Sequence, residues 1–211
     1  MELWLIRHPR PEVAPGICYG RTDIAVAEGE VEAALLNLHG RLPVFDRLRT
    51  SPAMRCRDLA RRLSDGSIDD ARLYERHFGA WEGRAWDDID RALLTAWAAD
   101  PWNFAPPGGE SARMLLERVN AALREETSAG GVAVWVTHQG VARAVAGALL
   151  DLPDEEWMSL TLGFGEAWRL VEQKGRWKQA KKKETAADGR EGHLPPAGTA
   201  EEGERPAAAS C

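Results

Sequence analysis

Short apolar runs alternate along this chain with stretches in which apolar residues recur every three or four positions. A short continuous run predicts a strand buried on both faces, whereas the longer recurrence predicts an amphipathic helix. The clearest strand is expected at residues 132–136. Other strands are expected at residues 3–6, 45–49, 71–74, 160–162 and 168–171, and helices at residues 31–38, 51–63, 86–98, 112–126 and 141–149.

Two of these helices carry capping signals at their first residues. Ser51 is followed by Pro52, which predicts a helix with the serine as N-cap and the proline in the first turn. Ser111 follows the breaker PPGG at residues 106–109 and predicts the start of the helix over residues 112–126. We therefore expect one helix to begin directly after each serine.

The alternation of strands and helices indicates an α/β fold, a three-layer sandwich whose mostly parallel central sheet is flanked by helices. Residues 1–177 are enough for one domain with a full-sized core. Residues 178–211 consist mainly of Lys, Glu, Ala, Gly and Pro. Because such a segment buries too little apolar surface to offset its ordering entropy, we expect a disordered tail there.

Charge and cysteine content narrow the possible partners and compartments. The formal net charge is −6, so neither nucleic acid nor an acidic membrane surface is expected as a partner. Cys18, Cys56 and Cys211 are odd in number and form no CxxC pair, which argues against a disulfide framework and a zinc site. Only four apolar residues separate Glu2 from Arg7, too few for a signal-peptide core, and we expect a cytoplasmic protein.

Polar side chains follow several predicted strands at the point where each strand ends. Arg7 and His8 follow the first strand, and His138 follows the clearest one. Arg55 lies in the first turn of the helix after the second strand, and Glu75 lies near the end of the third. Ligands of open α/β sheets bind at the carboxyl ends of the strands. We therefore expect two histidines, two arginines and one carboxylate along one edge of the sheet.

This set of side chains suits phosphoryl transfer. Arginine donates two parallel hydrogen bonds to phosphate oxygens and keeps its charge. A neutral imidazole is a competent nucleophile, and a carboxylic acid can protonate a leaving alkoxide and later deprotonate a water. The cationic side chains would neutralise the phosphate, so we expect neither a metal nor another cofactor. The expected partner is a small phosphorylated substrate.

Five motifs follow one another between residues 2 and 171, namely LIRHPRP, SPAMRCRDLA, LYERHFGAWEG, GGES and VTHQGVARA. In this order they resemble the histidine phosphatase (phosphoglycerate mutase-like) superfamily. Within it, the runs HPRPEVAPGICYGRTD, FGAWEG and GGES are most similar to α-ribazole phosphatases of cobalamin synthesis. The resemblance thus covers nearly everything outside the expected tail.

The resemblance assigns a role to each residue of the expected edge. His8 would carry the phosphoryl group, with Arg7 beside it in the family's RH pair. Arg55 falls on the arginine of the S-P-x-x-R pattern and would bind the phosphate. His138 falls on the second histidine of the family and would hold and polarise the phosphoryl oxygens.

The proton donor has two candidates. Glu75 falls on the glutamate of the family's E-x-x-F/Y-G pattern, and the resemblance makes it the acid. Glu82 lies in the same predicted loop and stays open as the alternative. Arg21, in the run YGRTD, would reach the phosphate or the leaving group.

Leu59 replaces the small or threonine residue common in the family's S-P-x-x-R helix, and two further residues depart from the family pattern beside the histidines. Pro9 replaces the glycine that usually follows the nucleophile, so the phosphate loses one backbone N–H donor there. Gln139 replaces the glycine that usually follows the second histidine and is expected to place a polar side chain near the pocket. None of these departures removes a catalytic group.

The leaving group is less defined than the reaction. Aromatic residues crowd residues 74–104, and we expect most of them to pack the sheet against its helices and one or two to reach the substrate. The resemblance implies α-ribazole 5′-phosphate as substrate. The alternatives are a broad-range or sugar-phosphate phosphatase and, from another class, a catalytically decayed phosphate-binding protein.

Overall fold

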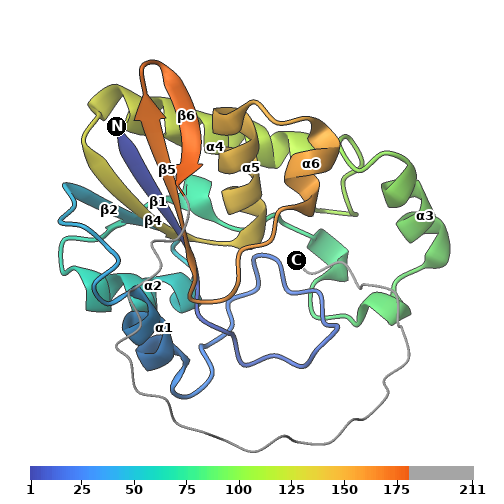
Figure 1. The fold of residues 1–211 in the computed structure, drawn as a ribbon. Coiled ribbons are helices and arrows are strands. Elements are labelled where there is room, and N and C mark those ends of the chain that lie inside the picture. Colours follow the sequence, from blue (N-terminus) through green and yellow to red (C-terminus); the bar gives the residue numbers. More distant parts are fainter. Residues whose placement is uncertain (181–211) are drawn as a thin grey trace, which may run out of the picture.

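Six strands form one sheet in the computed structural model, which describes residues 1–180 (Figure 1). They are β1 (Glu2–Arg7), β2 (Arg47–Thr50), β3 (Ile68–Asp69), β4 (Val132–Thr137), β5 (Ala167–Gln173) and β6 (Arg176–Ala180). Their order across the sheet is β3-β2-β4-β1-β5-β6. The first four strands in this order are parallel, whereas β5 runs antiparallel to β1 and β6 runs antiparallel to β5. The predicted α/β fold with a mostly parallel central sheet is confirmed.

Helices cover both faces of this sheet (Figure 1). The α-helices of the described residues are α1 (Glu30–Leu38), α2 (Met54–Leu63), α3 (Arg91–Ala99), α4 (Ala112–Ala129), α5 (Gln139–Leu150) and α6 (Asp154–Ser159). Side chains of β1 alternate between the two faces, as the pleat of a strand requires. Trp4 and Ile6 pack with α1 and α2, whereas Leu3 and Leu5 pack with α4, α5 and α6.

A third apolar cluster surrounds α3, which lies beyond α6 at the side of the molecule (Figure 1). It includes the short 3₁₀ helices η2 (Gly79–Trp81) and η3 (Trp86–Asp88). Phe78 and Trp81 are buried there, and the rings of Trp86 and Trp97 stack with their centroids 5.7 Å apart. Most aromatic side chains of this segment were predicted to pack the sheet against its helices. They are packed, but against one another in this separate cluster.

The helix predicted from Ser51 begins three residues later. Its first residue is Met54, whose N–H donates to a carboxylate oxygen of Asp23 (N–Oδ1 2.7 Å). Ser51 is not the N-cap, and its hydroxyl contacts His138 instead (Oγ–Nε2 2.8 Å). The prediction was wrong because a side chain from a distant part of the sequence binds this helix end.

Two further predictions failed at aspartates that start new helices. Residues 71–74 were expected as a strand, but Asp70 caps the 3₁₀ helix η1 (Ala71–Leu73), and strand β3 ends just before it. The helix expected at residues 86–98 is divided, because Asp90 caps α3 and separates it from η3. In both cases an aspartate side chain accepts the N–H two residues further on, which favours a new turn over continuation of the preceding segment. In contrast, Ser111 caps α4 as predicted.

The last strand, β6, was not predicted. It continues through Lys178 to Ala180 and pairs with β5, so these residues belong to the sheet. The rest of the expected tail lies outside the described residues. None of the helices within residues 1–180 is long and apolar enough to cross a membrane. The cytoplasmic location stays a prediction.

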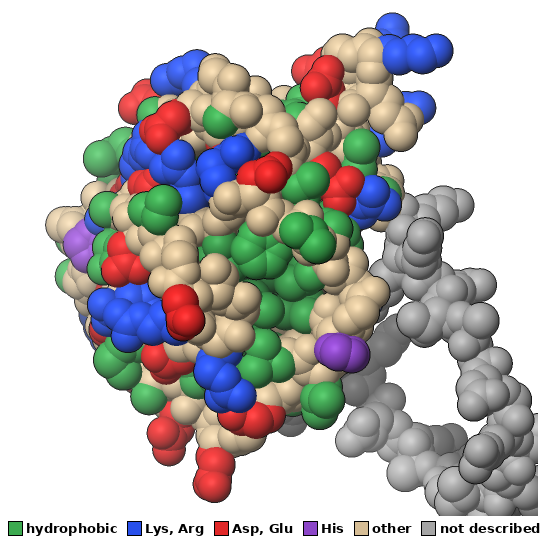
Figure 2. Space-filling view, turned by 90° about the vertical axis from the view of Figure 1, so that its left-hand side faces the viewer, with side chains coloured by type: hydrophobic (Ala, Val, Ile, Leu, Met, Phe, Trp, Pro, Cys, Tyr) green, Lys and Arg blue, Asp and Glu red, His purple; other side chains and the backbone are tan. Residues whose placement is uncertain are grey.

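Acidic and basic side chains are interspersed over the face of the molecule that lies at the left of Figure 1 (Figure 2). One network of ion pairs joins β2 to α4. Glu126 on α4 is completely buried and accepts hydrogen bonds from Arg47 (2.7 Å), Arg49 (2.9 Å) and Trp135 (2.9 Å). A carboxylate so placed ties the helix to two strands of the sheet.

Replacement of Glu126 by alanine is expected to destabilise the protein. The change removes the buried counter-charge of Arg47 and one of the carboxylates that pair with Arg49, which lowers the free energy of unfolding by about 3 kcal/mol. Urea denaturation measures it. The control is Glu125→Ala on the same helix, where an exposed carboxylate also pairs with Arg49. We expect a much smaller shift of the midpoint for this control, and equal losses would contradict the assignment.

Candidate active site

His8 lies at the carboxyl end of β1, next to the end of β4. Its N–H donates to the carbonyl of Thr137 (2.9 Å), and its side chain is buried. The ring Nδ1 lies 2.7 Å from the carbonyl oxygen of Pro9. Because a carbonyl can only accept, Nδ1 carries the hydrogen and Nε2 keeps its lone pair. Pro9 thus lacks an N–H, but its carbonyl orients the imidazole.

His138 stands against His8 at the start of α5. The two rings meet edge to face with centroids 5.1 Å apart. Nδ1 of His138 lies 3.3 Å from a guanidinium nitrogen of Arg55, which can only donate. Nε2 therefore carries the hydrogen and donates to Ser51 Oγ (2.8 Å). This pair of bonds defines the orientation and tautomer of the second histidine.

Burial lowers the pKa of His8 well below its ordinary value of 6.5, and the charge of Arg55 lowers it further. The hydrogen bond to Pro9 acts in the opposite direction and offsets only part of this effect. The pKa of His138 is also well below 6.5, because of burial first and the charge of Arg55 second. Both imidazoles are therefore neutral at neutral pH.

Arg55 is completely buried in the first turn of α2. Its terminal nitrogens donate to the backbone carbonyls of Thr22 (2.9 Å) and Gly20 (2.7 Å), in the loop that follows β1. No carboxylate among residues 1–180 forms an ion pair with it, and its Nε has no hydrogen-bond partner there. The site thus holds a buried positive charge whose partners are neutral.

Arg7, which precedes His8 in the chain, is held by two residues near the start of β5. A terminal nitrogen donates to the carbonyl of Leu162 (2.9 Å), and the guanidinium lies 3.8 Å from the centroid of Phe164. The Phe164 ring also approaches His8, with centroids 5.4 Å apart. The sequence offered no motif for Phe164, and we did not predict it.

The side chain of Gln139, which was expected near the pocket, is bound by backbone groups. It is buried and binds the backbone on both sides of Thr161, donating to the carbonyl of Leu160 (2.7 Å) and accepting the N–H of Leu162 (3.0 Å). A strand was predicted at residues 160–162, but these residues form none, and their backbone binds the side chain of Gln139. Since Leu162 in turn accepts from Arg7, Gln139 supports the arginine indirectly.

Glu75 joins this group through the start of α5. One carboxylate oxygen accepts the N–H of Gly140 (3.1 Å), two residues after His138, and the other accepts the N–H of Arg76 (2.9 Å). A Cβ at position 140 would lie 2.3 Å from the Glu75 carboxylate, so the close approach requires a glycine. Glu75 is buried, and its carboxylate binds the first turn of α5, directly after His138.

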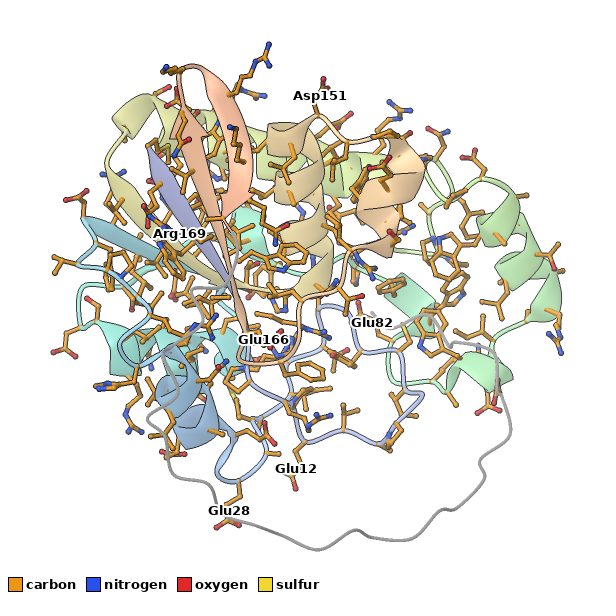
Figure 3. All side chains as sticks on the ribbon, in the orientation of Figure 1. Glu12, Glu28, Glu82, Asp151, Glu166 and Arg169 are labelled. Carbon is orange, nitrogen blue, oxygen red and sulfur yellow. The ribbon has the colours of Figure 1, made fainter. Side chains whose placement is uncertain are left out.

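Glu82, the alternative acid, is engaged elsewhere. Figure 3 shows it beside the loop that follows β1. Its carboxylate accepts the N–H groups of Phe78 (2.9 Å) and Arg21 (3.0 Å), and both the N–H (2.8 Å) and the hydroxyl (2.7 Å) of Thr22. With four donors, this carboxylate fastens the loop that supplies the carbonyl partners of Arg55.

Arg21 lies with Glu75 but not with the histidines. Its side chain donates to the backbone carbonyl of Glu75 (3.2 Å) and to the carboxylate of Glu110 (3.3 Å). No hydrogen bond or ion pair within residues 1–180 links it to His8 or Arg55. Contact with phosphate or leaving group stays a prediction for this residue.

A cavity of about 250 Å³ opens on the side of Glu75 and Gly140. Most of its lining is apolar and aromatic, with two arginines among it. The lining comprises Arg76, Phe78, Trp97, Ala112, Leu115, Arg143, Trp157 and Met158 besides Glu75 and Gly140. Within residues 1–180 no group of three or more His, Cys, Asp or Glu side chains is placed to hold a metal ion.

Comparison with known proteins identifies relatives of this chain. A family model, the histidine phosphatase superfamily (branch 1), matches residues 3–185. A glucosyl-3-phosphoglycerate phosphatase of Mycolicibacterium vanbaalenii is 31% identical over 186 residues, which cover 79% of this chain and 81% of the relative.

Two solved structures show the same fold. The α-ribazole phosphatase from Shigella flexneri superposes with a TM-score of 0.76 at 26% identity, covering 85% of this chain and 95% of the other. A mycobacterial glucosyl-3-phosphoglycerate phosphatase superposes with a TM-score of 0.73 at 26% identity, covering 84% and 96%. The chain is therefore similar to phosphatases that differ in substrate.

The two neutral histidines predict a loss of stability in mild acid. Because the pKa of each is lowered in the folded state, the unfolded chain binds protons first as the pH falls below 6.5. Each histidine then lowers the free energy of unfolding by up to about 1.4 kcal/mol per pH unit. Urea denaturation between pH 7.5 and 5.5 measures this slope. The slope should be smaller in His138→Gln, and an unchanged slope would contradict the lowered pKa.

Proposed function

This chain belongs to the histidine phosphatase superfamily (branch 1) and is a phosphoric monoester hydrolase, and we propose that it works through a phosphohistidine on His8. The observation that carries the proposal is the buried, neutral His8, whose Nδ1 is bound by Pro9 and whose Nε2 keeps its lone pair beside Arg55 and His138. A nucleophilic imidazole needs this protonation state.

In the first step His8 Nε2 attacks phosphorus, and the bond to the ester oxygen breaks. Glu75 protonates that oxygen as it leaves. Arg7 and Arg55 bind the equatorial oxygens and offset their charge, and His138 donates to the third oxygen when its Nε2–H exchanges Ser51 Oγ for that oxygen. Arg55 is suited to this role because its buried charge has only neutral partners among residues 1–180.

In the second step a water attacks the phosphorus of phospho-His8. Glu75, now a carboxylate, takes the proton of this water, and the nitrogen–phosphorus bond breaks to release inorganic phosphate and neutral His8. The N–H groups of Gly140 and Arg76 hold the carboxylate in one orientation through both steps. Glu82 is less suited, because four donors already bind its oxygens.

For the substrate we propose α-ribazole 5′-phosphate. The cavity is lined by Glu75, the proposed proton donor, so the leaving group of such an ester would extend into it, and rings such as Trp97 and Trp157 suit a flat benzimidazole nucleoside. The similarity in fold to the α-ribazole phosphatase from Shigella flexneri supports the same assignment. The intact, buried set of His8, Glu75 and His138 argues against a decayed phosphate-binding protein.

The second candidate is an anionic sugar phosphate. Arg76 and Arg143 line the same cavity and would suit a carboxylate on the leaving group. The curated relatives that match this chain at 31% and 34% identity are glucosyl-3-phosphoglycerate phosphatases. A substrate comparison separates the two candidates.

Replacement of His8 by alanine is expected to abolish hydrolysis of p-nitrophenyl phosphate in the presence of EDTA, because no covalent intermediate can form. The control is His39→Ala, which changes an exposed histidine at the end of α1 and should leave the rate unchanged. An acid-labile, alkali-stable phosphoenzyme should be trapped in the wild type alone. Equal turnover by the wild type and His8→Ala would refute the mechanism, and loss of all wild-type activity in EDTA would indicate a metal enzyme.

The leaving group is tested by comparing kcat/KM for α-ribazole 5′-phosphate with that for glucosyl-3-phosphoglycerate. We expect a preference of more than about tenfold for the former, equal to about 1.4 kcal/mol of transition-state stabilisation. Trp97→Ala should reduce this preference, because it removes a ring from the cavity wall. A preference for the sugar phosphate would favour the second candidate.

A further inference from the structure

Glu110, in the GGES motif before α4, is a buried carboxylate between two arginines. Its oxygens accept from Nε and a terminal nitrogen of Arg118 (2.8 and 2.9 Å) and from Arg21 (3.3 Å). Burial alone would raise the pKa of Glu110, but the hydrogen bonds and charge of Arg118, together with the charge of Arg21, lower it below its ordinary value. The carboxylate is therefore ionised at neutral pH.

Both arginines also bind the backbone of Glu75. Arg118 donates to the Glu75 carbonyl oxygen at 3.0 Å, and Arg21 donates to the same oxygen at 3.2 Å. Two guanidinium groups that share one acceptor repel each other, and a negative charge between them offsets this repulsion. Glu110 supplies that charge, so it holds both donors on the residue that carries the proposed acid.

The backbone of Glu110 binds the two residues that follow Glu75. Its N–H donates to the carbonyl of His77 (2.8 Å), and its carbonyl accepts from Nε of Arg76 (2.8 Å). This approach depends on the preceding Gly109, since a Cβ there would lie 2.7 Å from the His77 carbonyl oxygen. Gly109 of the motif thus has a physical reason, which is to bring Glu110 against residues 75–77.

We propose that Glu110 is a positioning residue for the proton donor, acting through Arg21 and Arg118 on the backbone of Glu75. The inference rests on the proposed function, in which Glu75 protonates the leaving group. Loss of the Glu110 charge frees the two arginines from the carbonyl and lets the Glu75 carboxyl move from the ester oxygen. Proton transfer requires hydrogen-bond distance, so a small displacement is enough to slow it.

The test uses two substrates of similar shape whose leaving groups differ in their need for a proton. Phenol is a more basic leaving group than p-nitrophenol, so phenyl phosphate depends more on a general acid. In Glu110→Gln we expect kcat/KM to fall by about tenfold more for phenyl phosphate than for p-nitrophenyl phosphate. Arg118→Lys, which keeps the charge but loses the forked geometry, should show the same bias to a smaller extent.

Three comparison variants make the outcomes separable. Glu126→Gln removes a buried, arginine-bound carboxylate near the opposite end of α4 that does not touch Glu75, and it should lower both rates equally or not at all. Glu75→Gln should show the largest bias, and adding Glu110→Gln to it should not enlarge that bias. His8→Ala should lack activity on either ester.

Each failure points to a different claim. Activity of His8→Ala would overturn the proposed function, and an unbiased loss in Glu75→Gln would overturn its role as acid. A biased loss in Glu75→Gln together with an unbiased loss in both Glu110→Gln and Arg118→Lys would overturn the positioning role of Glu110 alone. Urea midpoints of all variants establish that they are folded under the assay conditions.

Discussion

The structure depends on one costly arrangement, a guanidinium group buried at the carboxyl edge of the sheet with no carboxylate of residues 1–180 to pair with it. Arg55 is completely buried, and among residues 1–180 its partners are two backbone carbonyls and His138. Burying a charge in this way is unfavourable unless a counter-charge arrives. A phosphate dianion would supply this counter-charge, and contacts from several parts of the fold hold Arg55 in place before phosphate binds.

Two acidic side chains hold the loop and the helix around Arg55 in place. Glu82 fastens the loop whose carbonyls face Arg55, and Asp23 of the same loop binds the first turn of the helix that carries it. The charge also acts on the histidines, since it helps to lower the pKa of both. The positive field that would attract phosphate therefore adds to burial in keeping His8 unprotonated. Arg55 thus contributes both to phosphate binding and to the nucleophilicity of His8.

The buried strands and the residues that follow them were predictable from the chain alone. The apolar runs of β1 and β4 located the sheet, and parallel pairing of these strands brings His8 and His138 together. Ser51 was misread as a helix cap because its real partner, His138, is 87 residues away. Gln139 and Phe164 also act through contacts outside their own segments, with Leu160 and with Arg7. Local patterns contain no signal for such pairs, since the fold alone brings their partners within reach.

Burial, together with the charge of Arg55, keeps His8 a neutral nucleophile, and the carbonyl of Pro9 orients it. The most direct measurement is the ¹⁵N NMR spectrum of the His8 imidazole in the free enzyme at neutral pH. We expect a neutral ring with its hydrogen on Nδ1, bound to the carbonyl of Pro9, and with Nε2 unprotonated. An imidazolium at this pH, or a hydrogen on Nε2, would contradict it.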